Sequence, residues 1–232
     1  MKYKAEPEEF FALTFSLIND LQDSTVVKYK KKLINSYINT TIKLIQSKTA
    51  ALSHKFVMTV CMHSMVRHIE QESDMEMLPK EIREKIEREV VEYLCMQEIS
   101  RIRAIIIDLY TGLYTDDVNY SVRPENWAVK VVAELKTLTP LADTEMFKES
   151  KKLVLCRLQG LLAKELKEAF LSKSKPFGRK GNQLVINILY IQQYFKEHTS
   201  TEGMQELVKE IQGNFKDAGS VAKLEELKRF IK

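Results

Sequence analysis

The chain has 232 residues, enough to bury a hydrophobic core without disulfides or a metal ion, and a formal net charge of +4. A net charge this small does not by itself argue for a nucleic-acid partner, and no window of eighteen apolar residues is present that could span a membrane. Seven glycines and five prolines are about half the usual share, while Leu, Ile, Lys, Glu and Met are abundant. This balance favours helix over sheet and predicts an all-α fold.

The first expected helix is short and runs from Glu8 to about Leu21. It begins after Pro7, a residue that suits the first turn of a helix, and its acidic start matches the positive end of the helix dipole. One face carries the apolar residues Phe11, Phe15 and Ile18.

A long segment of a single charge sign follows. Between Glu8 and Leu78 the sequence has neither proline nor glycine, and the 46 residues from Ser24 to Ile69 contain no aspartate or glutamate. This pattern predicts one very long helix, which at ~1.5 Å per residue would span on the order of 70 Å, with a weak point at the polar run 46–49. The segment has a formal charge of +8 from Lys28, Lys30, Lys31, Lys32, Lys43, Lys48, Lys55 and Arg67.

The apolar stripe of this expected helix has the three-and-four spacing that a partner helix must cover. It consists of Ile34, Ile38, Ile42, Ile45, Leu52, Phe56 and Val60. A second long helix is expected from Pro79 to about Tyr110, and its first half leans acidic. If the two helices pack antiparallel, some lysines of the first face glutamates of the second.

The rest of the chain predicts shorter helices with short connections. A helix start is expected at 123–127, and further helices at about 144–172, 181–197, 202–215 and 220–232. We expect a domain boundary at the connection Thr139–Asp143, which gives an N-terminal helical bundle over 1–140 and a C-terminal helical bundle over 141–232. Because antiparallel bundles are how such helices bury their stripes, the expected architecture is two consecutive antiparallel bundles that form an elongated rod.

No constellation in the sequence predicts catalysis or metal binding. Cys61, Cys95 and Cys156 are far apart in apolar helical contexts, which predicts reduced core thiols in a cytosolic protein. Cys61 and His63 would point about 200° apart on a helix, and Cys61 and His68 would lie ~10 Å apart along its axis, too far for bonds of ~2 Å to one metal ion. No Walker loop or dinucleotide fingerprint is present. We therefore expect no catalytic residues, no metal and no cofactor.

Two basic clusters are the candidate binding residues. The first is Lys28, Lys30, Lys31 and Lys32, and the second is Lys173, Lys175, Arg179 and Lys180. Runs of charge are most often solvated surface. The functional interpretation is weak, salt-dependent binding to anionic lipid or to acidic helices of partner proteins. The Gly-x-x-Gly loop at 178–181 also matches the RNA clamp of KH domains, but that fold needs strands and the flanking sequence is helical.

One stretch of sequence resembles a known family. Residues 176–191, Pro-Phe-Gly-Arg-Lys-Gly-Asn-Gln-Leu-Val-Ile-Asn-Ile-Leu-Tyr-Ile, resemble a stretch near the C-terminus of the exocyst eighty-four-kilodalton subunit family, which belongs to the helical-rod multisubunit tethering complexes. In that pattern a proline and a glycine precede Gln-Phe/Leu-Val-Leu-Asp and a helix with an aromatic residue. Asn182 and Asn187 depart from it, since they stand where the pattern usually has Leu or Gln and Asp.

The resemblance implies a function and partners. Members of the family have no catalytic residues and hold secretory vesicles at the plasma membrane before fusion, in contact with other subunits, small GTPases, fusion proteins and lipids. The chain would be the C-terminal part of such a subunit, cytoplasmic and peripheral to the plasma membrane. The expected function is a non-enzymatic structural subunit of a vesicle-tethering complex. The alternative is a helical nucleic-acid-binding protein that uses the basic clusters at 28–32 and 173–180.

Overall fold

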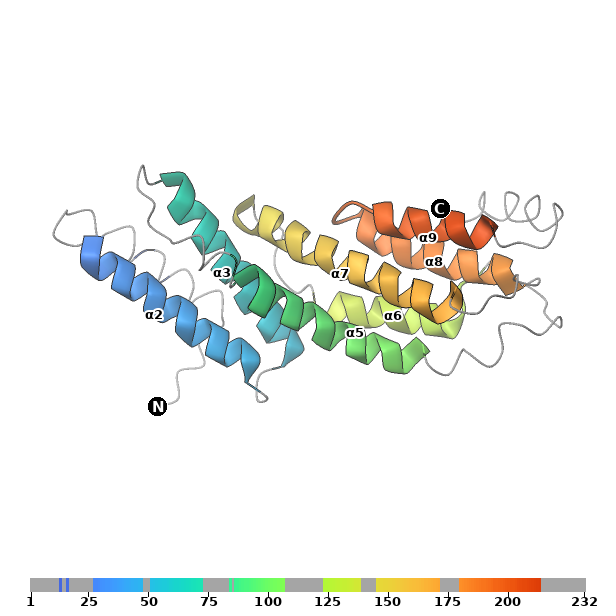
Figure 1. Ribbon diagram of the computed structural model, residues 1–232, viewed down its shortest axis with the longest axis horizontal. Coiled ribbons are helices and arrows are strands. Elements are labelled where there is room, and N and C mark those ends of the chain that lie inside the picture. The colour runs from blue at the N-terminus through green and yellow to red at the C-terminus, as the bar shows by residue number, and fades with distance from the viewer. Residues whose placement is uncertain are drawn as a thin grey trace. The chain divides into compact units, whose positions relative to one another are not determined.

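The described part of the chain is almost entirely helical. The computed structural model describes residues 13, 16, 27–47, 51–72, 84, 86–106, 123–138, 145–171 and 180–213. Over these residues the chain forms α-helices and one π-helical segment, joined by turns, and no strand occurs among them (Figure 1). The all-α prediction is therefore confirmed.

The chain divides into two compact units. The first comprises Met1–Met96 and Thr137–Val154, and the second comprises Gln97–Lys136 and Leu155–Lys232. This division differs from the domains 1–140 and 141–232 expected from the sequence. The reason is that helix α5 (Glu92–Ile106) and helix α7 (Glu145–Leu171) each contribute residues to both units. No proline or glycine marks either crossing, so the sequence carries no signal of it. The elongated rod stays a prediction.

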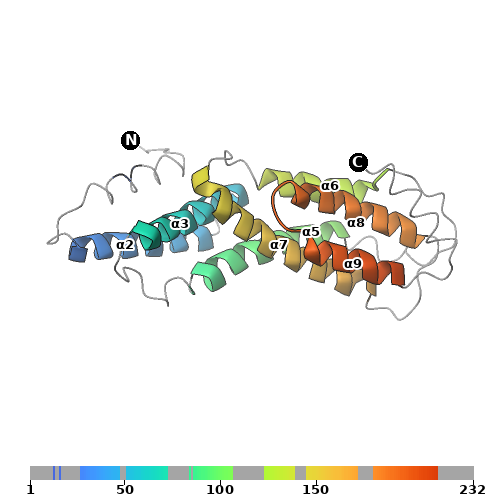
Figure 2. The same ribbon diagram turned by 90° about the horizontal axis from the view of Figure 1, so that it is seen from above.

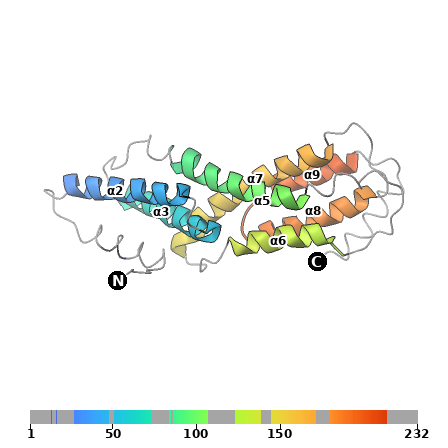
Figure 3. The ribbon, with the colours of Figure 1, turned by 90° about the horizontal axis from the view of Figure 1, so that it is seen from below.

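The long basic helix expected over 24–69 is wrong, because the structure breaks it into two helices. Helix α2 covers Val27–Gln46 and helix α3 covers Leu52–Glu72, and the two pack against one another as a hairpin (Figures 2 and 3). At the break, the Ser47 hydroxyl and the Ser47 N–H both donate to the Leu44 carbonyl, at 2.7 and 3.2 Å. These bonds reach back three residues and compete with the four-residue pattern of the α-helix, so the polar run ends the helix.

The core of the first unit follows the expected apolar stripe. The stripe residues Ile34, Ile38, Ile42, Ile45, Phe56 and Val60 are all buried, and Leu52 is half-buried. The π-helix η2 (Ile86–Val91) packs on both α2 and α3, with Ile86, Val90 and Val91 buried. The helix expected from Pro79 to Tyr110 is thus present over 86–106, where η2 leads into α5. Its start, apart from Glu84, and its last four residues lie outside the described residues.

The second unit contains the shorter helices that the sequence predicts. They are α6 (Asn126–Thr137), α8 (Lys180–Lys196) and α9 (Glu202–Gly213), together with the ends of α5 and α7. Helices α8 and α9 pack side by side as a hairpin. The Trp127 and Phe170 rings lie 6.0 Å apart in the core. The helices expected at 8–21 and 220–232 lie outside the described residues, apart from Leu13 and Ser16, which are helical and exposed.

Candidate functional site

The structure places the two predicted basic clusters only in part. Three members lie outside the described residues: Lys173, Lys175 and Arg179. The other five lie on helices, where Lys180 opens α8 and the first six residues of α2 contain Lys28, Lys30, Lys31 and Lys32. Among these five only the Lys32 side chain is described, and it is exposed. Both clusters therefore stay predictions.

One cation of the basic segment does not face solvent. The Lys55 side chain on α3 is buried, and its Nζ lies 5.6 Å from the centroid of the Tyr93 ring, which belongs to α5. An ammonium group at this distance is attracted by the electrons of the ring face. Lys55 therefore stabilises the packing inside the first unit and is not available to a partner.

A histidine and two serines form a hydrogen-bonded group in the first unit. Ser150 Oγ of α7 lies 2.9 Å from His63 Nδ1, and the Ser64 hydroxyl donates to Ser150 Oγ at 2.8 Å. The Ser150–His63 distance is that of a nucleophile and its base. Sequence reasoning missed the pair because the two residues stand 87 positions apart.

Burial argues against catalysis by this group. Ser150 is 1% exposed and His63 is 6% exposed. Ser150 also lies within a regular helix, where backbone N–H groups bond to carbonyls four residues back and cannot stabilise an oxyanion. The arrangement fits a helix-to-helix contact that satisfies buried polar groups.

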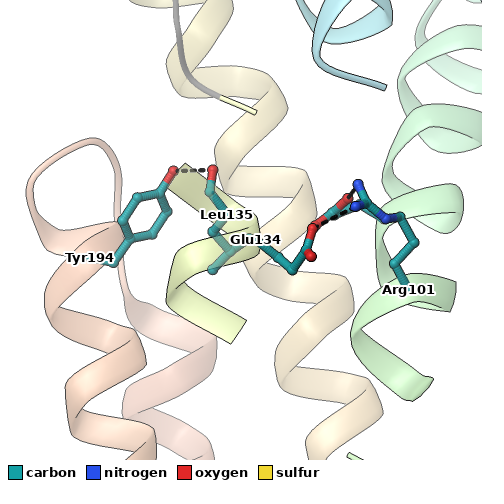
Figure 4. Close-up of polar contacts among 5 residues, drawn as sticks. Arg101, Glu134, Leu135 and Tyr194 are labelled. Carbon is teal, nitrogen blue, oxygen red and sulfur yellow. Dashed lines mark hydrogen bonds and ion pairs between the residues drawn. The ribbon is translucent and has the colours of Figure 1, made fainter. Parts of the chain in front are cut away.

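A second polar group, with one buried carboxyl, lies between α5 and α6. Arg101 of α5 bridges two carboxylates. Its Nη2 lies 2.7 Å from Glu134 Oε2 (Figure 4), and its Nη1 lies 3.5 Å from Glu98 Oε2. The Glu98 side chain is 1% exposed, and its Oε1 has no hydrogen-bond partner. Burial raises the pKa of Glu98 to about 7, the Arg101 guanidinium opposes this shift, and the Glu134 carboxylate adds to it. Glu98 therefore changes charge close to neutral pH.

Three polar side chains on one face of α8 hold both ends of α6. At the start of α6, Asn187 Oδ1 accepts from the Glu125 backbone N–H at 2.8 Å, and Asn187 Nδ2 donates to Glu125 Oε2 at 2.6 Å. Gln183 Nε2 donates to the Arg123 carbonyl at 3.0 Å. At the other end, the Tyr194 hydroxyl donates to the Leu135 carbonyl at 3.0 Å (Figure 4). The bonds to the Glu125 N–H and the Leu135 carbonyl satisfy backbone groups that a helix leaves unpaired at its ends.

Of the resembling stretch 176–191, the part whose side chains the structure describes, 181–191, is largely a packing element. Every residue from 181 to 188 is buried. Gln183 and Asn187 of this stretch make the bonds to the start of α6, whereas the Asn182 amide is fully buried and has no hydrogen-bond partner at either of its polar atoms. A fully buried amide without partners costs stability.

The cysteines differ in their surroundings. Cys61 and Cys95 are buried, as expected, and Cys95 Sγ lies 3.8 Å from the Val154 carbonyl oxygen. The prediction of a core position for Cys156 is wrong, because this thiol is exposed on the outer side of α7.

No group of three or more His, Cys, Asp or Glu residues in the described part of the chain is placed to hold a metal ion. Over the same residues, no helix has the length and hydropathy needed to cross a bilayer.

Comparison with known proteins gave no match to any family model, curated protein or solved structure. The family assignment therefore rests on the quoted residues 176–191 and stays a prediction.

Proposed function

We propose that the protein is a non-enzymatic structural subunit of an exocyst-like vesicle-tethering complex, which helps to hold secretory vesicles at the plasma membrane before fusion. It acts through protein contacts along its helices. The observation that carries the proposal is that interior polar side chains form hydrogen bonds between helices. Gln183, Asn187 and Tyr194 tie α8 to α6, and His63 and Ser150 tie α3 to α7. Because these interior polar side chains are engaged in helix packing, they support a function exerted through the protein surface.

The resemblance at 176–191 supports the more specific part of the proposal. The buried residues of this stretch determine how α8 packs, so a likeness there favours a shared helical architecture. Residues that build a core do not identify partners. The partners proposed are the other subunits of the tethering complex, small GTPases and fusion proteins, with a weak contact to anionic lipid through the basic clusters.

Depletion of the protein in its own cells is expected to leave secretory vesicles accumulated beneath the plasma membrane. Loss of a tether removes the step that holds a vesicle in place before fusion, while vesicle formation continues. Electron microscopy can count vesicles near the membrane before and after depletion, and re-expression of the parent chain should restore the original number. An unchanged vesicle count after complete depletion would contradict the proposal.

A nucleic-acid titration separates the proposal from its alternative. Binding through the clusters at 28–32 and 173–180 would rest on phosphate contacts, so the affinity would fall steeply between ~50 and ~200 mM salt. We expect weak binding of RNA and DNA at both salt concentrations. Tight binding with a steep salt dependence would favour the nucleic-acid-binding function.

A further inference from the structure

Helix α2 carries two copies of a Lys-Leu pair on its solvent side. Lys32 precedes Leu33, and Lys43 precedes Leu44. Leu33 is 40% exposed and Leu44 is 49% exposed, and the two lysines are exposed as well. The isoleucines of α2 are buried in the core, whereas these two leucines leave apolar surface in contact with water.

The two pairs lie on one side of the helix. Eleven residues correspond to three turns plus about 20°, so the second pair lies almost directly along the axis from the first, ~16 Å away. Ser36 and Thr40 lie between them, exposed and uncharged. We define the α2 outer face by six residues: Lys32, Leu33, Ser36, Thr40, Lys43 and Leu44.

The charge of this face has one sign. The sequence from Ser24 to Ile69 contains no acidic residue, and the exposed charged side chains described on α2 are Lys32 and Lys43. We propose that the α2 outer face docks an acidic amphipathic helix of a partner protein, whose leucine-type residues cover Leu33 and Leu44 and whose carboxylates meet the two lysines. This inference rests on the proposed scaffold function and names the chemistry of one of its partners.

A helix fits this face better than a bilayer does. A helix that lies on a membrane has basic residues on both sides of a central apolar face. On α2 the leucines border the buried side, since Ile34 and Ile45 lie about 100–120° around the axis from Leu33, and the two described lysine side chains, Lys32 and Lys43, lie on the opposite border of the outer face. A partner helix about 10 Å wide can follow the line of the leucines with the lysines along one edge.

A second copy of the chain fits less well than a partner protein. Two identical α2 outer faces related by a two-fold axis would bring Lys32 and Lys43 of both copies into one interface that contains no acid from α2. Like charges brought close together repel. Charge complementarity therefore favours a partner with an acidic helix.

The test measures binding of a synthetic peptide to the full chain. The probe is a fluorescent helix-forming peptide of ~21 residues with leucines at three-and-four spacing and glutamates at flanking positions, and its comparator is a scrambled peptide of the same composition. Fluorescence anisotropy should show the probe binding about tenfold more tightly than the comparator. Leu33→Ser/Leu44→Ser should weaken probe binding about tenfold at any salt concentration. Lys32→Glu/Lys43→Glu should weaken it about tenfold at ~50 mM salt and much less at ~1 M, where screening is strong.

Helix α6 supplies a matched control. On this helix Val129 is 41% exposed and the adjacent Lys130 is also exposed. The two residues form one exposed pair of an apolar and a basic residue, comparable to each Lys-Leu pair of α2. Val129→Ser/Lys130→Glu should leave probe binding unchanged, and circular dichroism should show equal helix content in all variants. Equal binding of probe and comparator, or an equal loss in the α6 control, would overturn the proposal.

Two further readouts assign the other occupants. Vesicles rich in phosphatidylserine should bind no better to the parent chain than to Leu33→Ser/Leu44→Ser. If the leucine variant abolishes vesicle binding or a dimer seen by sedimentation, while the probe does not bind, the face is a lipid site or a self-association site and the proposal is wrong.

Capture of tethering subunits is a separate outcome. Subunits captured equally by parent and leucine variant, with no probe binding, overturn the docking proposal alone. Specific probe binding without captured subunits overturns the tethering function alone.

Discussion

Replacing Glu98 with glutamine is expected to raise the free energy of unfolding at pH 8 by about 1–3 kcal/mol, because the parent chain then carries a buried carboxylate at this position. Glutamine keeps the shape of the side chain and removes its charge. Urea unfolding followed by the fluorescence of Trp127 reports on the second unit, since this is the one tryptophan of the chain and it is buried there.

The pH dependence of this effect has a definite sign. The pKa of Glu98 rises from 4.5 to about 7 on folding, because burial disfavours the ionised form. Of the charged groups that act on it, Arg101 on its own helix opposes the shift and Glu134 on α6 adds to it. The folded state therefore binds the proton more tightly than the unfolded state. The stability linked to Glu98 is complete below pH 4.5 and is lost as the pH rises through about 7.

The comparison of two glutamine variants isolates this group. Glu98→Gln should flatten the decline in stability between about pH 5 and pH 8. Glu206→Gln, an exposed position on α9, should leave the decline as it is in the parent chain. A loss of stability in Glu98→Gln at pH 8, or an unchanged pH slope, would show that the Glu98 carboxylate is better solvated or better paired than its surroundings indicate.

Asn187→Asp is expected to lower the free energy of unfolding by about 2–3 kcal/mol. Asn187 Nδ2 donates to Glu125 Oε2 at 2.6 Å, and an aspartate would place a second carboxylate against that oxygen. Asn187 is fully buried, whereas Glu125 is exposed, so water relieves part of the repulsion. Unfolding in urea with the Trp127 probe measures the loss.

A rescue and a control make this prediction specific. Adding Glu125→Gln to Asn187→Asp should recover most of the lost stability, because the glutamine amide can donate to the new carboxylate. Asn126→Asp, at the exposed first residue of α6, should be neutral or slightly stabilising, since a negative charge suits the start of a helix. Failure of the double variant to recover stability would mean that the Asn187–Glu125 bond does not hold α8 to α6.

The same bond accounts for the amide at position 187. In this chain the neighbouring acceptor is the Glu125 carboxylate, which requires a donor at position 187. An amide supplies both that donor and an acceptor for the Glu125 N–H.

Helices α7 and α8 were predictable because local signals mark their ends. The expected helix at 144–172 is observed at Glu145–Leu171, and the one at 181–197 is observed at Lys180–Lys196. The break at Ser47 was harder to predict. Neither proline nor glycine is present there. The helix ends where the Ser47 hydroxyl donates to the Leu44 carbonyl, and a serine on a helix surface does not always make this bond. Nothing in the sequence marks the π-helix at 86–91.

The interior polar groups could not be predicted, because their members are distant in sequence. Tyr194 and the Leu135 carbonyl stand 59 positions apart, and Asn187 and Glu125 stand 62 apart. Glu98 and Arg101 form the three-residue pair that is common on helix surfaces, and only the packing of α6 makes Glu98 a buried carboxyl. For the predicted basic clusters, the structure establishes that the Lys32 side chain is exposed. Leu33 and Leu44 could not be singled out from the sequence, because only their exposed fractions distinguish them from the buried apolar residues of α2.

The most direct test of the proposed function is affinity capture of the tagged chain from nuclease-treated extract of its own cells at physiological salt. The account predicts that several other subunits of a vesicle-tethering complex co-purify in constant proportion to one another, and that removal of nucleic acid does not reduce their recovery. Recovery of nucleic-acid-binding proteins in place of tethering subunits, or of no partner by a chain that is folded and fully helical, would contradict it.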